Sequence, residues 1–243
     1  MVFKSKRDFF SIVLVVTIFL SLLNSCEKEQ SIVEIHKAKE SLAALGFDFT
    51  EDSFMKAIEE KNASLVKLFI EAGMAVDTKI KVGNLELPAI FYALEKGNDL
   101  VAQLFVEKGA KLNLSVKGVS VLMKAVEKAN TDTIATIIEK GGDVNFSGFQ
   151  GLTPLMVAIE RGNSGAIWLL LGKGAEINKA DKNGITPLMR SVRAGDVDIV
   201  RELITRGADV NAVSKNGMKM ASLVSEKNKE AITILLKDAG VKF

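Results

Sequence analysis

Cysteine and histidine are almost absent from this 243-residue sequence, which contains one of each, three prolines, one tryptophan and one tyrosine. A single cysteine excludes an intramolecular disulfide. One histidine, His36, has no cysteine or second histidine to complete the three or four ligands typical of a zinc site. We therefore expect a fold stabilised by packing alone, with no metal and no cofactor, and we interpret His36 as a surface residue.

Charge is absent from residues 9–23, FFSIVLVVTIFLSLL, which follow a short basic segment with Lys4, Lys6 and Arg7. A basic start followed by an apolar stretch of about 7–15 residues is typical of a secretory signal peptide. A membrane-spanning helix usually needs about 20 apolar residues, so a lasting span is the alternative that this length disfavours.

The lone cysteine follows that apolar stretch directly. The segment Leu23-Asn24-Ser25-Cys26 resembles a bacterial lipobox, with an aliphatic residue, a small residue and then cysteine. The resemblance implies that residues 1–25 are a lipoprotein signal peptide and that Cys26 carries a lipid, which would hold the protein on a membrane through at least two acyl chains. It also implies a bacterial cell-envelope protein that faces the periplasm or the cell surface. The alternative is a chance cysteine after an ordinary signal peptide.

Net charge is also low, formally +2 for the whole sequence. Residues 1–25 hold three basic groups and one acidic group, so the remainder has 29 of each sign. A protein that binds nucleic acid usually has a basic stripe, and this balance gives no reason to expect one.

A repeat of 33 residues fills most of the chain. Segments that begin at Gly118, Gly151 and Gly184 align without a gap, and the same phase extends in both directions. We predict six units within residues 50–243, namely 50–85, 86–117, 118–150, 151–183, 184–216 and 217–243.

The residue pattern within each unit predicts two short helices. Thr153-Pro154 and Thr186-Pro187 are typical of a helix start, with threonine as the N-cap and proline at the first position. Glycine or asparagine ends the first helix at Gly97, Gly162, Gly195 and Asn228. The second helix has apolar pairs four positions apart, which predicts that Leu170 and Leu203 are buried. An extended segment such as GADVN follows.

The T-P-L and G-A-D-V-N segments at this period resemble the ankyrin repeat, over residues 50–243. The resemblance implies an all-α solenoid of about six helix-turn-helix units with projecting hairpin-like fingers, a protein-binding role, and partner contacts on finger tips and inner helices. The family's usual histidine after T-P-L is replaced by a column of mainly methionine: Met55, Phe91, Met123, Met156, Met189 and Ser222. We expect those turns to be held less rigidly.

Residues 26–49 precede the repeats. Helical spacing of apolar residues predicts a short polar tether and then a helix to about Leu45 that caps the first repeat through Leu42 and Leu45. Phe47 and Phe49 are expected to anchor the turn that follows Gly46.

Nucleotide-binding and catalytic motifs are missing, so we expect neither an enzyme nor a small-molecule substrate. Carboxylates recur beside basic residues at equivalent positions of the inner helices, as in Glu127-Lys128 and Glu160-Arg161. Such a column is either a solvated face with weak ion pairs or a surface that binds a partner.

These observations favour a membrane-anchored module that binds a protein. A structural or protective partner of a membrane-associated enzyme or toxin is the alternative. Phe149 stands at a finger position where the next unit has a polar turn, and an exposed phenylalanine forgoes burial worth about 1.5–3 kcal/mol. Tyrosine and arginine are enriched at binding hot spots. We predict that the partner contacts are Phe149, Phe146, Tyr92, Arg190, Lys56 and Lys124. Trp168, on a second helix, either faces solvent as a rival contact or folds onto its neighbours.

Overall fold

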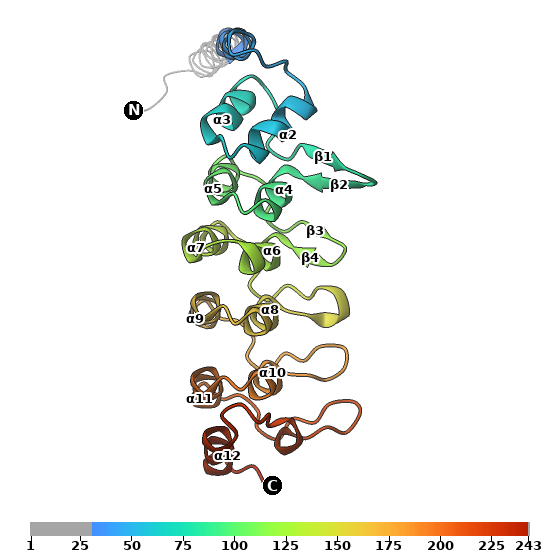
Figure 1. Cartoon of the computed structure of the whole chain (residues 1–243), viewed down its shortest axis with the longest axis vertical. Coiled ribbons are helices and arrows are strands. Elements are labelled where there is room, and N and C mark those ends of the chain that lie inside the picture. The colour runs from blue at the N-terminus through green and yellow to red at the C-terminus, as the bar shows by residue number, and fades with distance from the viewer. Residues whose placement is uncertain (1–30, 243) are drawn as a thin grey trace, which may run out of the picture. The chain divides into compact units, whose positions relative to one another are not determined.

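The computed structural model describes residues 31–242 and divides them into two compact units, residues 31–75 and residues 76–242 (Figure 1). The predicted signal peptide and Cys26 lie outside the described residues. No helix within residues 31–242 is long and apolar enough to cross a membrane.

The first unit packs a helix over residues 31–44 with α2 (Glu51–Glu59) and α3 (Ala63–Glu71). Three phenylalanines surround the buried ring of Phe69, whose centroid lies 5.6 Å from that of Phe54, 6.2 Å from that of Phe49 and 6.5 Å from that of Phe47. The prediction that Phe47 and Phe49 anchor this turn is therefore confirmed.

The preceding helix was expected to cap the first repeat through Leu42 and Leu45, which is confirmed for Leu42 and wrong for Leu45. Leu42 is fully buried, whereas Leu45 is 62 % exposed. The helix ends at residue 44, and the Leu45 amide donates to the carbonyls of both Ser41 and Leu42 as the chain turns toward Gly46. Leu45 therefore lies beyond the last helical turn, outside the face that Leu42 shares with the core.

The second unit repeats a pair of helices along its length. The first helices of the pairs are α4 (Ala89–Glu95), α6 (Val121–Lys128), α8 (Pro154–Arg161) and α10 (Pro187–Ala194). The second helices are α5 (Asp99–Glu107), α7 (Thr131–Glu139), α9 (Ser164–Gly172) and α11 (Val197–Thr205). The 3-10 helix η2 (Met220–Leu223) and α12 (Lys229–Asp238) follow. Figure 1 shows two parallel columns, one of first helices and one of second helices.

The predicted helix starts at Thr153 and Thr186 and the predicted helix ends at Gly162 and Gly195 are confirmed. The prediction for Asn228 is wrong, because this residue is the N-cap of α12 and does not end a first helix. Thr153 and Thr186 accept hydrogen bonds from the amides of Met156 and Met189, each at 3.3 Å, and proline occupies the first turn of both helices. Leu170 and Leu203 are fully buried, as predicted. Each second helix has an Asn or Asp N-cap, whose side-chain oxygen accepts a hydrogen bond from the backbone amide three residues later. These N-caps are Asn98, Asn130, Asn163 and Asp196.

Five loops project from the column of first helices in the second unit, toward one side in Figure 1. We call them fingers one to five: residues 78–88, 113–120, 146–153, 179–186 and 212–219. Finger one is an antiparallel hairpin of β1 (Lys79–Val82) and β2 (Leu85–Pro88). Finger two pairs β3 (Ser115–Val116) with β4 (Val119–Ser120). Finger three contains a 3-10 turn, η1 (Phe149–Gly151), and finger five contains a bridge between Val213 and Lys219. The fold is thus helix-rich with two short hairpins.

Asparagines join successive repeats at the base of the fingers. The Asn178 amide donates to the Gly207 carbonyl at 3.2 Å, and its oxygen accepts from the Asp209 amide at 2.8 Å. Asn145 bonds in the same way to Gly174 and Glu176. Because each side chain links two backbone groups of the next unit, it fixes the distance between neighbouring repeats.

Candidate protein-binding surface

The finger row, which we define as fingers one to five together, presents one large aromatic side chain to solvent. Phe149 is 63 % exposed, beside the half-buried Phe146 in finger three. Val82 and Leu85 of finger one are 37 % and 39 % exposed, and Val213 of finger five is 51 % exposed. Apolar side chains are therefore present on several fingers, and Phe149 is the most exposed of them.

The backbone around Phe149 is held on several sides. Its amide donates to the Gly118 carbonyl of finger two at 2.9 Å. Within finger three, the Gly148 amide donates to the Leu152 carbonyl at 2.8 Å, and Gln150 adopts a positive φ of 57°. A non-glycine residue in that conformation costs free energy and persists only where its surroundings enforce it. Phe149 is consequently displayed on a rigid turn.

Two glycines permit this close approach. A Cβ on Gly118 would lie 2.7 Å from the Phe149 nitrogen, and a Cβ on Gly148 would lie 2.2 Å from the Gly118 oxygen. Real Cβ atoms essentially never make contacts shorter than 3.0 Å, so a side chain at either glycine would push fingers two and three apart. The presentation of Phe149 thus depends on Gly118 and Gly148.

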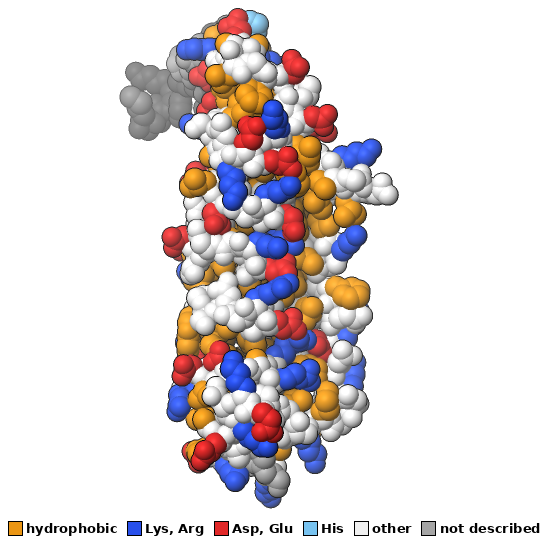
Figure 2. Space-filling view, viewed as in Figure 1, with side chains coloured by type: hydrophobic (Ala, Val, Ile, Leu, Met, Phe, Trp, Pro, Cys, Tyr) orange, Lys and Arg blue, Asp and Glu red, His pale blue; other side chains and the backbone are white. Residues whose placement is uncertain are grey.

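The inner helices, α4, α6, α8 and α10, carry a ladder of ion pairs that joins successive repeats. The Lys124 ammonium on α6 lies 2.8 Å from Glu95 on α4 and 3.1 Å from Glu127. Glu127 also accepts from Arg161 on α8. Figure 2 shows basic and acidic side chains alternating along this column.

The ladder shifts the pKa of two of its members. Desolvation alone would lower the pKa of Lys124, but its hydrogen bonds to Glu95 and Glu127 outweigh that effect and raise the pKa. The hydrogen bond from Lys124 lowers the pKa of Glu95. Both shifts favour the charged forms, so Lys124 is engaged in a bridge between repeats rather than presented to a partner.

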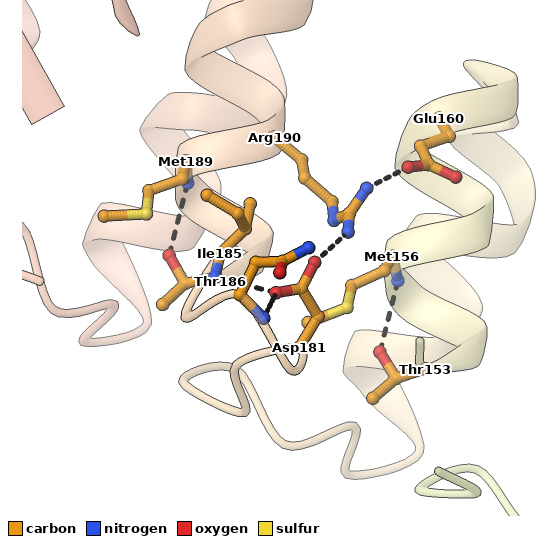
Figure 3. A network of polar contacts seen from close by, with 9 residues as sticks. Thr153, Met156, Glu160, Asp181, Ile185, Thr186, Met189 and Arg190 are labelled. Atoms are coloured by element: carbon orange, nitrogen blue, oxygen red, sulfur yellow. Dashed lines mark hydrogen bonds and ion pairs between the residues drawn. The ribbon is translucent and has the colours of Figure 1, made fainter. Parts of the chain in front are cut away.

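Arg190 is engaged in a similar way (Figure 3). Its guanidinium bonds to Glu160 on α8 and to Asp181 of finger four, and its side chain is only 15 % exposed. The other oxygen of Asp181 accepts from the amides of Asn183 and Ile185 at 2.8 and 3.0 Å. Burial, with a smaller contribution from Arg193, lowers the pKa of Arg190. Arg190 therefore links finger four to two inner helices.

Several predicted contact residues are thus placed away from an accessible surface. Tyr92 is 3 % exposed, so its phenol ring belongs to the core. Lys56 is exposed, but it lies on α2 in the first unit, apart from the second unit that carries the fingers, and it pairs with Glu60 at 3.8 Å. Cys26 lies outside the described residues. Of the predicted set on the second unit, the accessible position is Phe149, with Phe146 half-buried beside it.

The sequence analysis did not identify the exposed lysines of the finger row as candidate contact residues. Lys117, Lys182 and Lys215 lie at finger turns and are exposed to solvent. Their signal is weak because lysine is common at any exposed turn, and the pattern emerges once the fingers are seen to lie in one row.

The second helices offer a different exposed surface. Trp168 on α9 is 42 % exposed, so it neither faces solvent completely nor folds down completely. Leu100 on α5 is 67 % exposed. These two residues are separate from the finger row in the fold, and they provide matched comparisons for Phe149.

No group of three or more His, Cys, Asp and Glu side chains between residues 31 and 242 is placed to hold a metal ion.

Comparison with known proteins agrees with this architecture. Residues 54–148, 122–214 and 155–243 each match the family model for ankyrin repeats in three copies. A protein of Treponema pallidum (strain Nichols), described as ankyrin repeat-containing, is 28 % identical over 113 residues. That alignment covers 46 % of this chain and 37 % of the relative, so the chain spans well under two thirds of the relative's length.

Proposed function

The chain belongs to the ankyrin-repeat family, and from that premise we propose that it binds a protein partner across the finger row, with Phe149 as the central anchor. The family is generally a non-enzymatic module for protein interaction, and we propose no catalytic role. One observation carries the assignment to this surface: a large aromatic side chain, 63 % exposed, is presented on a turn whose backbone is fixed by a neighbouring finger.

The energetics of recognition support that choice. A phenylalanine that becomes covered by a partner contributes about 1.5–3 kcal/mol from burial. Because the turn is rigid before binding, little additional conformational entropy is lost when the complex forms. Binding hot spots commonly combine these two properties, and in the finger row the side chain of Phe149 has both.

The inner helices have a supporting role in this proposal. Arg190 and Lys124 are paired across repeats and so hold the fingers and the repeats in register. Tyr92 fills the core beneath the same surface. These three residues shape the surface, and we do not propose them as direct contacts.

We further propose that the module is held on a bacterial membrane by a lipid on Cys26, after removal of residues 1–25. The support is the sequence Leu23-Asn24-Ser25-Cys26 after an apolar stretch. On this proposal the repeats face the periplasm or the cell surface and recruit a partner to the envelope. The predicted six repeat units and their boundaries remain part of the same proposal.

The function is tested by partner capture. The full chain, immobilised in detergent, is exposed to an envelope extract of the organism that makes it, alongside the variants Phe149→Ala, Leu100→Ala and Trp168→Ala. We expect Phe149→Ala to lose a specific protein that the other two variants retain, with all three folded by circular dichroism. If Trp168→Ala alone abolishes capture, the partner binds the second helices and the assignment is wrong.

A further inference from the structure

The finger row has a strong excess of positive charge. Finger three contains no charged residue, and the other four fingers hold seven basic residues against two acidic ones. The basic residues are Lys79, Lys81, Lys117, Lys179, Lys182, Lys215 and Lys219, and the acidic ones are Glu86 and Asp181.

Both acidic residues of the row are already neutralised. Glu86 lies 3.5 Å from Lys79, and Asp181 is buried and bonded to Arg190. By contrast, five of the lysines are exposed and make no ion pair with any described residue: Lys81, Lys117, Lys182, Lys215 and Lys219. Their charges are not required by the fold.

Three acidic residues elsewhere in the second unit accept backbone hydrogen bonds. Asp196 caps α11, Asp77 accepts from the Lys111 amide, and Asp99 accepts from the Asn130 amide. The inner helices and their first flanking residues add further positive charge, with six basic residues against three acidic ones. The basic residues are Lys96, Lys124, Lys128, Arg161, Arg190 and Arg193, and the acidic ones are Glu95, Glu127 and Glu160. The side that bears the fingers is therefore positive, although the chain as a whole is nearly neutral.

The apolar anchor lies between these charges. The Phe149 amide bonds to the carbonyl of Gly118, next to Lys117, and the Lys182 amide bonds to the carbonyl of Gln150, next to Phe149. Fingers two, three and four therefore place lysine, phenylalanine and lysine side by side. The Lys215 amide continues this series by bonding to the Asn183 carbonyl.

We infer that the finger row recognises an acidic, extended segment of a partner protein, with carboxylates opposite the unpaired lysines and an apolar side chain against Phe149. This inference rests on the proposed function and specifies the chemistry of its partner. Charge complementarity of this kind sets specificity and speeds association.

A protein segment fits the surface better than a lipid bilayer does. The hairpin of finger one extends visibly farther than the other fingers (Figure 1). A flat membrane would meet this hairpin before the other fingers, which carry Lys117, Lys182 and Lys215. A segment of polypeptide can follow the uneven row from one finger to the next.

The test uses fluorescein-labelled synthetic peptides and the full chain in detergent. We expect a peptide of repeated Asp-Leu-Asp-Ser to bind, as measured by fluorescence anisotropy, and a peptide of repeated Lys-Leu-Lys-Ser not to bind. Raising the salt concentration from about 50 to about 200 mM should weaken binding, because exposed charges are screened. The triple variant Lys117→Gln/Lys182→Gln/Lys215→Gln should bind the acidic peptide about 3- to 100-fold more weakly.

A matched variant controls for overall charge. Lys108→Gln/Lys140→Gln/Lys173→Gln removes the same charge from exposed lysines at the ends of α5, α7 and α9, and should bind within about twofold of the parent. Phe149→Ala should weaken binding of the Asp-Leu peptide but leave a peptide of repeated Asp-Ser unaffected, because the second peptide has no apolar side chain.

Three results would overturn the inference. The first is equal binding of the acidic and basic peptides. The second is binding to vesicles of phosphatidylglycerol and phosphatidylcholine that is lost in the finger triple variant, which would make the row a membrane surface. The third is that no peptide binds while Phe149-dependent capture of a protein persists. The proposed function would then be supported, and the inference that the partner segment is acidic would be wrong. If capture fails too, the proposed function falls with it.

Discussion

Replacing Asn178 with alanine tests how the repeats are joined. The substitution removes two hydrogen bonds to the next unit, one to the Gly207 carbonyl and one from the Asp209 amide. Each such bond contributes about 0.5–1.5 kcal/mol net. Because the side chain is exposed and water can replace part of the lost bonding, we expect a loss of about 1–2 kcal/mol in the free energy of unfolding.

Asn211 offers a matched control. It occupies the equivalent place one repeat later, it is also exposed, and its side chain makes no hydrogen bond to any described residue. Asn211→Ala should therefore change the stability by less than about 0.5 kcal/mol. The measurement is equilibrium urea unfolding followed by circular dichroism, with the slope compared between variants to check that the cooperativity is unchanged. Equal losses for the two variants would refute the role assigned to the asparagines.

Three further predictions concern the core, the ladder and the anchor. Leu203→Ala removes a fully buried side chain and should cost about 2–5 kcal/mol in urea unfolding, whereas Arg201→Ala, on the exposed face of the same helix, should cost less than about 0.5 kcal/mol; similar losses would mean that the helix faces are misassigned. The pKa of Glu95 is lowered in the folded state, so its bond to Lys124 stabilises the fold above the unfolded pKa near 4.5 and this contribution is lost as the pH falls through the lowered value. The stability difference between the parent and Lys124→Met should therefore shrink as the pH is lowered below that range, and a difference that grows instead would contradict this sign. Cys26→Ser should abolish lipid attachment, so that the variant stays unprocessed or leaves the detergent phase, and a processed variant that still partitions into detergent would exclude the lipid anchor.

Much of the fold could be predicted because the same helix caps and apolar positions recur in successive repeats. The caps at Thr153 and Thr186 and the burial of Leu170 and Leu203 follow from short-range chemistry. The exposure of Phe149 followed from comparison between units, since a finger turn has little apolar surface to cover a side chain.

The burial of Tyr92 could not be predicted in the same way. Its position falls in a column that holds Lys56, Lys124 and Arg190 in other units, and these types suggested an accessible surface. In the second unit this column is largely covered: the Lys124 and Arg190 side chains are 17 % and 15 % exposed. A long charged side chain extends from such a site toward a partner carboxylate, whereas the compact ring of Tyr92 stays inside.

The pairing within the ladder also depends on information that the sequence does not contain. Neighbouring columns of Glu and Lys or Arg suggested charges that alternate along the surface. The charges do alternate (Figure 2), but the sequence did not show that bonds join successive repeats, from Lys124 to Glu95 and from Arg190 to Glu160, in addition to the pair of Lys124 with Glu127 within α6. Which carboxylate meets which cation depends on how far one repeat is displaced from the next.

Site-directed photo-crosslinking tests the central claim most directly. A benzoylphenylalanine placed at position 149, 100 or 168 of the full chain is irradiated in living cells of the organism that makes the protein, and the adducts are identified by mass spectrometry. The account predicts that position 149 alone yields a specific protein adduct, and that the crosslinked peptide is rich in Asp and Glu. Adducts at position 168 or 100 with none at position 149 would contradict it.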